Sequence, residues 1–189
     1  MITLVLGGAR SGKSRYSLKL ANIAAKQGKS CVFVATAQAF DDEMRQRIER
    51  HRQERETGET PWQVIETPMT LSDTLAQHGG AHQFVVVDCL TLWLTNHLVN
   101  HSDWQQVKAE LLQTLMQTSA DVVLVSNEVG LGVIPADPLS RRFVDEAGWL
   151  HQDLAQIADE VVLVTAGLPQ RLKSATLSTA SVDDIGATI

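Results

Sequence analysis

The sequence predicts an α/β fold in which helices cover both faces of a mostly parallel sheet. Its apolar runs are short, β-branched and continuous rather than alternating, as in strands that are buried on both faces. Amphipathic helical patterns separate these runs, so that strand and helix alternate along the chain. A glycine-rich turn joins the first strand to the first helix. The predicted strands cover residues 2–6, 30–35, 62–65, 84–87, 121–125 and 160–164.

Length, charge and cysteine content restrict the class of protein. The 189 residues, 44% of them hydrophobic, suffice for one well-buried domain, which we place at residues 1–173 with a C-terminal extension at 174–189. A net charge of −6 leaves no surplus of cations for a phosphate backbone, so nucleic acid is not an expected partner. No apolar run approaches a membrane span of about 18 residues. Cys31 and Cys89 lack metal-ligand spacing, which favours reduced thiols in a cytoplasmic protein.

The turn after the first strand fits the phosphate-loop pattern G-x-x-x-x-G-K-[ST]. Its glycines let backbone N–H groups curl round phosphate oxygens at the positive N-terminal end of a helix. Lys13 would place a charge on the β- and γ-phosphates, and Ser14 would offer a hydroxyl to Mg²⁺. The alternative is a glycine turn with an incidental lysine. We therefore expect a nucleoside triphosphate to bind at Gly7, Gly8, Ala9, Arg10, Ser11, Gly12, Lys13 and Ser14.

A long charged segment, residues 41–56, has the composition of a helix. Charge pairs at i,i+4 on a solvated helix face explain most of this composition. Met44, Ile48 and His51 nevertheless share one helical stripe, and four arginines surround the histidine. Surrounding cations favour a neutral imidazole, which is suited to attack a phosphorus atom. From the residues alone, the alternative is a partly buried polar histidine.

Polar residues directly follow two of the predicted strands, at the position where open α/β sheets bind ligands. Asp88 closes one apolar run, where phosphate-loop proteins hold Mg²⁺ through an acidic residue. The alternative is a cap for the segment that starts at Leu90. Asn127 and Glu128 follow another run and would face the phosphates. Glu128 would then orient a hydroxyl nucleophile or contact a metal, or else make only local hydrogen bonds.

Two later segments show the clearest helical periodicity, at residues 104–116 and about 140–158. In each, apolar residues recur on one face at the spacing of an amphipathic helix. These residues are Val107, Leu111 and Leu115 in the first segment and Phe143, Ala147, Leu150, Leu154 and Ile157 in the second.

Six stretches of the chain carry a resemblance by their order and spacing. They are Gly7 to Arg15; Ala35 to Gln38; Asp42, Glu43 and Met44 with Arg47, Ile48 and His51; Asn127 to Gly130 with Gly132 and Pro135; Arg142, Phe143, Asp145 and Gly148; and Ala158 to Val161. Together they cover about residues 2–173 and resemble one family, the bifunctional adenosylcobinamide kinase and adenosylcobinamide-phosphate guanylyltransferase of cobalamin biosynthesis.

The resemblance implies a P-loop NTPase of the RecA-like kind and two reactions at one phosphate loop. ATP or GTP, with Mg²⁺, first phosphorylates adenosylcobinamide. GTP then donates GMP to that phosphate through a guanylylated histidine, with loss of pyrophosphate, and the matching histidine is His51. The resemblance also implies a homotrimer. The nucleotide contacts that it implies are Thr36, Ala37, Gln38, Arg52, Gln53, Glu54, Arg55, Glu66 and Asp88.

The chain departs from the family pattern at three places. Some relatives carry two adjacent histidines where this chain has Arg50 and His51, and Asp88 stands in place of a glutamate. The extension after Lys173 has no counterpart. Two alternatives remain: a nucleotide hydrolase or regulator on the same RecA-like fold, in which His51 is idle, and a simple small-molecule kinase without guanylyl transfer.

Overall fold

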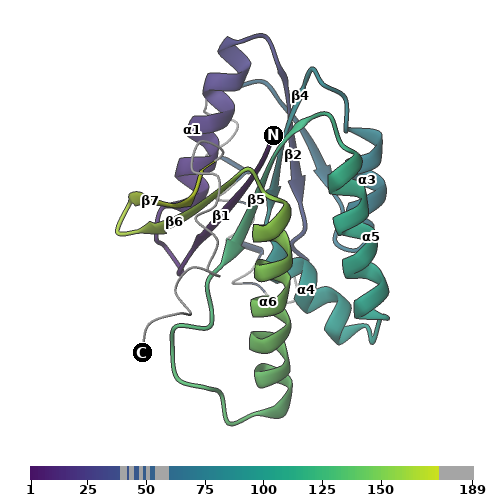
Figure 1. Cartoon of the computed structure of the whole chain (residues 1–189), viewed down its shortest axis with the longest axis vertical. Helices are drawn as coiled ribbons and strands as arrows, with labels where there is room; N and C mark the ends of the chain where they lie inside the picture. Colours follow the sequence, from purple (N-terminus) through teal and green to yellow (C-terminus); the bar gives the residue numbers. More distant parts are fainter. Residues whose placement is uncertain (39–41, 43–44, 47–48, 50–51, 54–59, 175–189) are drawn as a thin grey trace, which may run out of the picture.

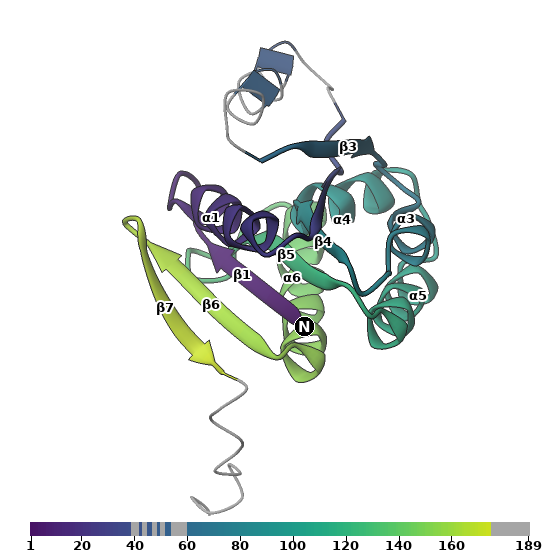
Figure 2. The same ribbon diagram turned by 90° about the horizontal axis from the view of Figure 1, so that it is seen from above.

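The computed structural model describes residues 1–38, 42, 45, 46, 49, 52, 53 and 60–174. Within these ranges one seven-stranded sheet has the order β3-β2-β4-β5-β1-β6-β7 (Figure 1; β3 is labelled in Figure 2). All neighbouring strands are parallel except β7, which is antiparallel to β6. The strands are β1 (Ile2–Gly7), β2 (Ser30–Ala35), β3 (Trp62–Glu66), β4 (Gln83–Asp88), β5 (Asp121–Asn127), β6 (Glu160–Thr165) and β7 (Leu168–Lys173). The helices are α1 (Lys13–Lys26), α3 (Leu71–Gln77), α4 (Leu90–Val99), α5 (Trp104–Gln117) and α6 (Pro138–Ile157).

Helices cover both faces of the sheet, as predicted (Figure 2). Successive side chains of a strand point to opposite faces, so each central strand contributes to two cores. In β5, Val122 and Leu124 belong to the core under α3, α4, α5 and α6, whereas Val123 and Val125 belong to the core under α1. The continuous apolar runs of the sequence therefore mark strands that are buried on both faces, which confirms the α/β prediction.

The two most periodic helices begin at aspartate caps. Asp103 accepts a hydrogen bond from the Gln106 N–H at the start of α5, and Asp137 accepts one from the Ser140 N–H at the start of α6. Such caps satisfy N–H groups that have no partner inside the helix. Pro138 then occupies the first turn of α6, where its missing N–H costs nothing. Both helices lie within two residues of their predicted bounds.

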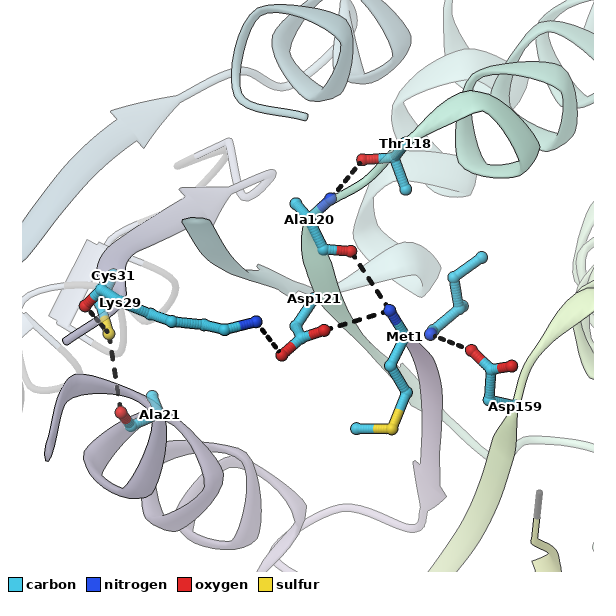
Figure 3. Close-up of polar contacts among 9 residues, drawn as sticks. Met1, Ala21, Lys29, Cys31, Thr118, Ala120, Asp121 and Asp159 are labelled. Carbon is cyan, nitrogen blue, oxygen red and sulfur yellow. Dashed lines mark hydrogen bonds and ion pairs between the residues drawn. The ribbon is translucent and has the colours of Figure 1, made fainter. Parts of the chain in front are cut away.

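Charged groups fasten the edge of the sheet at which the strands begin (Figure 3). The N-terminal ammonium donates to Asp121 Oδ1 at 3.1 Å, and Lys29 Nζ lies 2.5 Å from Asp121 Oδ2. Burial alone would raise the pKa of Asp121, but these two cations hold it below its ordinary value. Asp159 likewise accepts from the Ile2 N–H at 2.7 Å. Ion pairs thus hold the amino edge of the sheet, where the parallel strands begin. The carboxyl edge, where these strands end, carries the candidate site.

Three local predictions need correction or completion. The run at 62–65 is expected to be buried on both faces, but β3 lies at the edge of the sheet, where Gln63 and Val64 are exposed. The antiparallel strand β7 is not predicted at all, because it follows β6 through the tight turn of Ala166 and Gly167 rather than through a helix. Helices α3 and α4, whose bounds are not predicted, follow β3 and β4 and complete the predicted alternation of strand and helix. None of the helices in the described ranges has the length and apolar content needed to cross a membrane.

Candidate functional site

The phosphate-loop motif forms the turn between β1 and α1. Gly7 ends β1, and a Cβ placed there would come within 2.5 Å of the carbonyl oxygen of Val164, so no larger residue fits. Gly12 has a φ of 101°, in the region that only glycine adopts without strain, and stands directly before the helix. Gly7 is therefore required by close packing at the end of the strand, and Gly12 by the backbone conformation at the start of the helix.

Lys13 and Ser11 hold the loop in shape. Lys13 is only 7% exposed, and its Nζ donates to the carbonyl oxygen of Gly8 at 3.0 Å, so the ammonium lies folded over the loop. The Ser11 N–H donates to the same Gly8 oxygen, while the Ser11 carbonyl accepts from the Gly167 N–H at 2.7 Å. The turn between β6 and β7 therefore supports the phosphate loop through Gly167, and the Lys13 ammonium lies against the loop.

Ser14 and Asp88 meet at the base of the loop. The Ser14 hydroxyl donates to Asp88 Oδ2 at 3.0 Å, although 74 residues separate them. The cap position of α4 belongs to Cys89, so the alternative of Asp88 as a helix cap does not fit the structure. A hydroxyl and a carboxylate are the oxygen donors that Mg²⁺ takes from proteins beside phosphate oxygens, so the pair fits a magnesium ion. Among the described residues, no three His, Cys, Asp or Glu side chains form a metal cluster.

The end of β2 is joined to the end of β4 through Thr36. Its hydroxyl donates to the Cys89 carbonyl at 2.7 Å and accepts from the Cys89 N–H at 2.9 Å. Asn96 Nδ2 donates to the Thr36 carbonyl at 2.9 Å. The side chain of Thr36 is fully buried and connects the two strand ends. The next two residues, Ala37 and Gln38, are half-buried and therefore closer to solvent.

Asn127 and Glu128 follow β5 beside the phosphate loop. Asn127 is in register with Gly7, and its Nδ2 donates to Thr91 Oγ1 at 2.8 Å, while its Oδ1 is buried without a partner in the described part of the chain. The Glu128 N–H donates to the Gly7 carbonyl at 3.0 Å. The Glu128 carboxylate accepts from the N–H groups of Gly130 and Leu131, at 2.8 and 3.1 Å. In this structure Glu128 makes local hydrogen bonds, which is the second of the two roles considered for it.

His151 of α6, which the sequence analysis does not single out, contacts the end of β5. His151 Nε2 is 2.7 Å from Ser126 Oγ. Burial lowers the pKa of His151, and the nearby carboxylate of Glu128 opposes part of that change, so a neutral imidazole is favoured. Its position on the inner stripe of α6, one residue after Leu150, is the only sequence signal for this pair.

The remaining predicted residues are divided between described and undescribed segments. Glu66 ends β3 and is exposed; Ala35 pairs with both Glu66 and Asp88, so all three lie along one edge of the sheet. Arg52 and Gln53 are exposed. The three predicted residues outside the described ranges are His51, Glu54 and Arg55, and the predicted extension also lies outside them from residue 175 onward.

Comparison with protein families identifies the chain. Residues 3–172 match the model of the family described as cobinamide kinase / cobinamide phosphate guanyltransferase. The chain belongs to this family. The match runs from β1 to β7 and includes the phosphate loop, the Ser14–Asp88 pair and the loop after β5.

Two relatives in this family cover nearly the whole chain. A Pseudomonas aeruginosa protein described as bifunctional adenosylcobalamin biosynthesis protein CobP is 48% identical over 92% of this chain and 98% of its own length. The Escherichia coli protein described as bifunctional adenosylcobalamin biosynthesis protein CobU is 36% identical over 92% of this chain and 100% of its own length.

A solved structure confirms the fold class. This structure, described as an ATPase domain, superposes with a TM-score of 0.50 at 12% identity, covering 86% of this chain and 68% of that domain. At this identity the likeness concerns the fold alone. It agrees with the prediction of a P-loop NTPase built on a mostly parallel sheet.

Proposed function

We propose that this chain phosphorylates adenosylcobinamide with a nucleoside triphosphate and then transfers GMP from GTP to adenosylcobinamide phosphate through a guanylylated histidine. The product is adenosyl-GDP-cobinamide. The observation that carries the proposal is the buried Lys13 in a phosphate loop beside the Ser14–Asp88 pair, in a chain of the cobinamide kinase family. That arrangement serves either reaction, because both require a bound triphosphate.

In the kinase step, Lys13 and the backbone N–H groups of the loop bind the β- and γ-phosphates. Mg²⁺, held by Ser14 and Asp88, would neutralise charge on the phosphates during transfer. Lys13 now bonds a loop carbonyl, so it exchanges that bond for phosphate oxygens when nucleotide enters. The corrinoid hydroxyl attacks the γ-phosphorus, the bond between that phosphorus and the β,γ-bridging oxygen breaks, the nucleoside diphosphate leaves, and the hydroxyl proton passes to solvent. No protein nucleophile is needed for this step.

In the guanylyl step, a nitrogen of His51 attacks the α-phosphorus of GTP. A nitrogen–phosphorus bond forms, the bond between the α-phosphorus and the bridging oxygen breaks, and pyrophosphate leaves. An oxygen of the corrinoid phosphate then attacks the same phosphorus and releases the histidine. We assign the guanine nucleotide contacts to Ala37, Gln38, Arg52, Gln53, Glu54, Arg55 and Glu66, as the family resemblance implies. Thr36, whose buried hydroxyl is bonded to Cys89, would act by positioning Ala37 and Gln38.

Radiolabelled GTP distinguishes this function from its two alternatives. With cobinamide as acceptor, label from the γ-phosphate should enter the corrinoid first, and label from the α-phosphate should enter it later. Transfer of γ-label alone would identify a simple small-molecule kinase. Release of γ-label as inorganic phosphate, with no labelled corrinoid, would identify a nucleotide hydrolase or regulator.

Assembly and location complete the proposal. We propose a homotrimer, as the family resemblance implies. We also propose a cytoplasmic location, which two free, buried cysteines in the described chain support. Sedimentation velocity of the purified protein measures the first point, with a single trimeric species as the expected result.

A further inference from the structure

We infer that the corrinoid ring docks on an apolar surface at the carboxyl edge of the sheet, formed by the loop before α6, the first turns of α6 and the end of α4. This inference rests on the proposed function and concerns the acceptor rather than the nucleotide. We call it the α4–α6 surface and define it by the exposed side chains of Val99, Leu131, Val133, Ile134 and Leu139, together with a cavity lined by Thr95, Leu98, Val99, Leu139, Ser140 and Phe143.

The loop between β5 and α6 exposes three apolar side chains to an unusual extent. Leu131 is 82% exposed, Val133 96% and Ile134 77%. Single exposed apolar residues are common, but three in one short loop, followed by the exposed Leu139 in the first turn of α6, are typical of an interaction site. Figure 1 shows this loop reaching past the carboxyl edge of the sheet, on the side where β1 ends.

The cavity adds shape to the apolar surface. It has a volume of about 200 Å³, and none of its six lining residues is charged. Its hydroxyls already donate within the protein, from Thr95 to the Thr91 carbonyl and from Ser140 to Asp137 Oδ2. Their oxygens keep lone pairs that accept hydrogen bonds. The cavity therefore fits a carbon-rich group that carries an N–H donor and does not fit a phosphate.

Both walls of the surface begin at the phosphate site. Helix α4 follows Asp88 after a single residue, and the loop before α6 begins at Glu128, whose N–H is bonded to Gly7. The Glu128 carboxylate holds the N–H groups of Gly130 and Leu131, so the start of the loop is fixed against the phosphate loop. A ligand that covers the start of this loop thus lies beside the phosphate loop.

The chemistry of a corrinoid matches these features. Its ring is a large carbon skeleton with methyl groups at its rim and amide side chains that carry N–H donors. Such a ligand is held by apolar area and a few hydrogen bonds, whereas a nucleotide is held by charge. The cavity is far too small for the whole ring, so it would take one peripheral amide arm while Val133 and Ile134 cover a ring face.

The test compares cobinamide binding in wild-type protein, the double variant Val133→Ser/Ile134→Ser and the control Met116→Ser. Met116 is 64% exposed on α5, outside the proposed surface. Equilibrium dialysis with cobinamide should show a Kd raised about tenfold in the double variant and unchanged in the control. The KM for cobinamide in the kinase assay should rise by a similar factor, with kcat and GTP binding nearly unchanged. The replaced side chains are exposed, so the urea unfolding midpoint serves only to verify folding.

Three results would overturn the inference. The first is an unchanged cobinamide Kd in the double variant with its assembly unchanged as well. The second is an unchanged Kd together with a smaller assembly in sedimentation, which would assign the surface to a second copy of the chain. The third is wild-type protein that gains covalent GMP from GTP yet binds no cobinamide, which removes the docking site but leaves the nucleotide chemistry intact. Wild-type protein that does neither contradicts the proposed function as well.

Discussion

The phosphate loop and the α4–α6 surface share one edge of the sheet but are built in opposite ways. At the loop, polar groups are buried and bonded to one another; Lys13 is 7% exposed, and Ser14 is bonded to Asp88. At the surface, apolar groups are exposed, Val133 to 96%. Fixed charges suit a small anion, and exposed apolar area suits a large ligand. Changes at the loop should therefore alter turnover, and changes at the surface should alter the affinity for the acceptor.

The largest expected effect comes from removing the cation of the loop. In Lys13→Ala, kinase turnover should fall about a thousandfold, because the transition state loses its fixed positive charge. Guanylyl transfer should be lost as well, while cobinamide binding persists. Steady-state kinase kinetics measure the effect, with Lys19→Ala, an exposed lysine of α1, as the matched control. A Lys13→Ala variant that keeps a tenth of wild-type turnover contradicts the phosphate-loop assignment.

A smaller effect is expected at the proposed magnesium ligand. Asp88→Asn keeps the shape of the side chain and loses its charge, so the Mg²⁺ concentration for half-maximal kinase activity should rise about tenfold. Nucleotide binding should change less, because Lys13 and the loop backbone remain. Asp73→Asn, at an exposed position of α3, is the control. Superimposable Mg²⁺ titrations of the wild type and Asp88→Asn would show that Asp88 only orients Ser14.

The smallest effect concerns His151 of α6, which contacts Ser126 in β5. Burial lowers the pKa of His151 in the folded protein below its ordinary value of 6.5, with opposition from Glu128. The unfolded chain therefore binds this proton first as the pH falls, so the free energy of unfolding decreases below about pH 6.5 and levels off below the folded pKa.

Urea unfolding at a series of pH values measures this contribution. Over that range His151→Gln should lose less stability than the wild type, by about 1.4 kcal/mol for each unit that separates the folded and unfolded pKa values of the histidine. The difference between the two slopes separates His151 from the carboxylates that titrate in both proteins. Parallel curves would mean that His151 is not protonated on unfolding.

The sequence predicts most of the sheet because continuous β-branched runs have few alternative structures. It predicts α6 closely because apolar residues recur at helical spacing from Phe143 to Ile157, although the Asp137 cap places the start two residues before the predicted one. It misses β7, whose residues Leu168–Lys173 include a proline and polar side chains that argue against a strand, and which forms only at the edge. It overestimates the burial of β3 because strand order is a tertiary property that a local pattern does not contain.

The candidate site divides in the same way. Motif spacing predicts the loop, because a phosphate loop requires a fixed order of residue types. The position of Asp88 directly after an apolar run predicts its place at the same site. The pairing of Ser126 with His151 depends on how α6 packs against β5, so no local pattern reveals it. The α4–α6 surface is also invisible locally, since its apolar residues come from two helices and a loop. The role of His51 stays a prediction, because that residue lies outside the described ranges.

The most direct test of the proposed mechanism is the mass of the intact protein after incubation with GTP and Mg²⁺, followed by peptide mapping. The mechanism predicts a gain of one GMP on His51, labile in acid and stable in alkali, as expected for a phosphorus–nitrogen bond. His51→Asn should lose the adduct and guanylyl transfer while still phosphorylating adenosylcobinamide, and His101→Asn, at an exposed turn, should retain all three. An adduct on another residue, or guanylyl transfer that persists in His51→Asn, would contradict the mechanism.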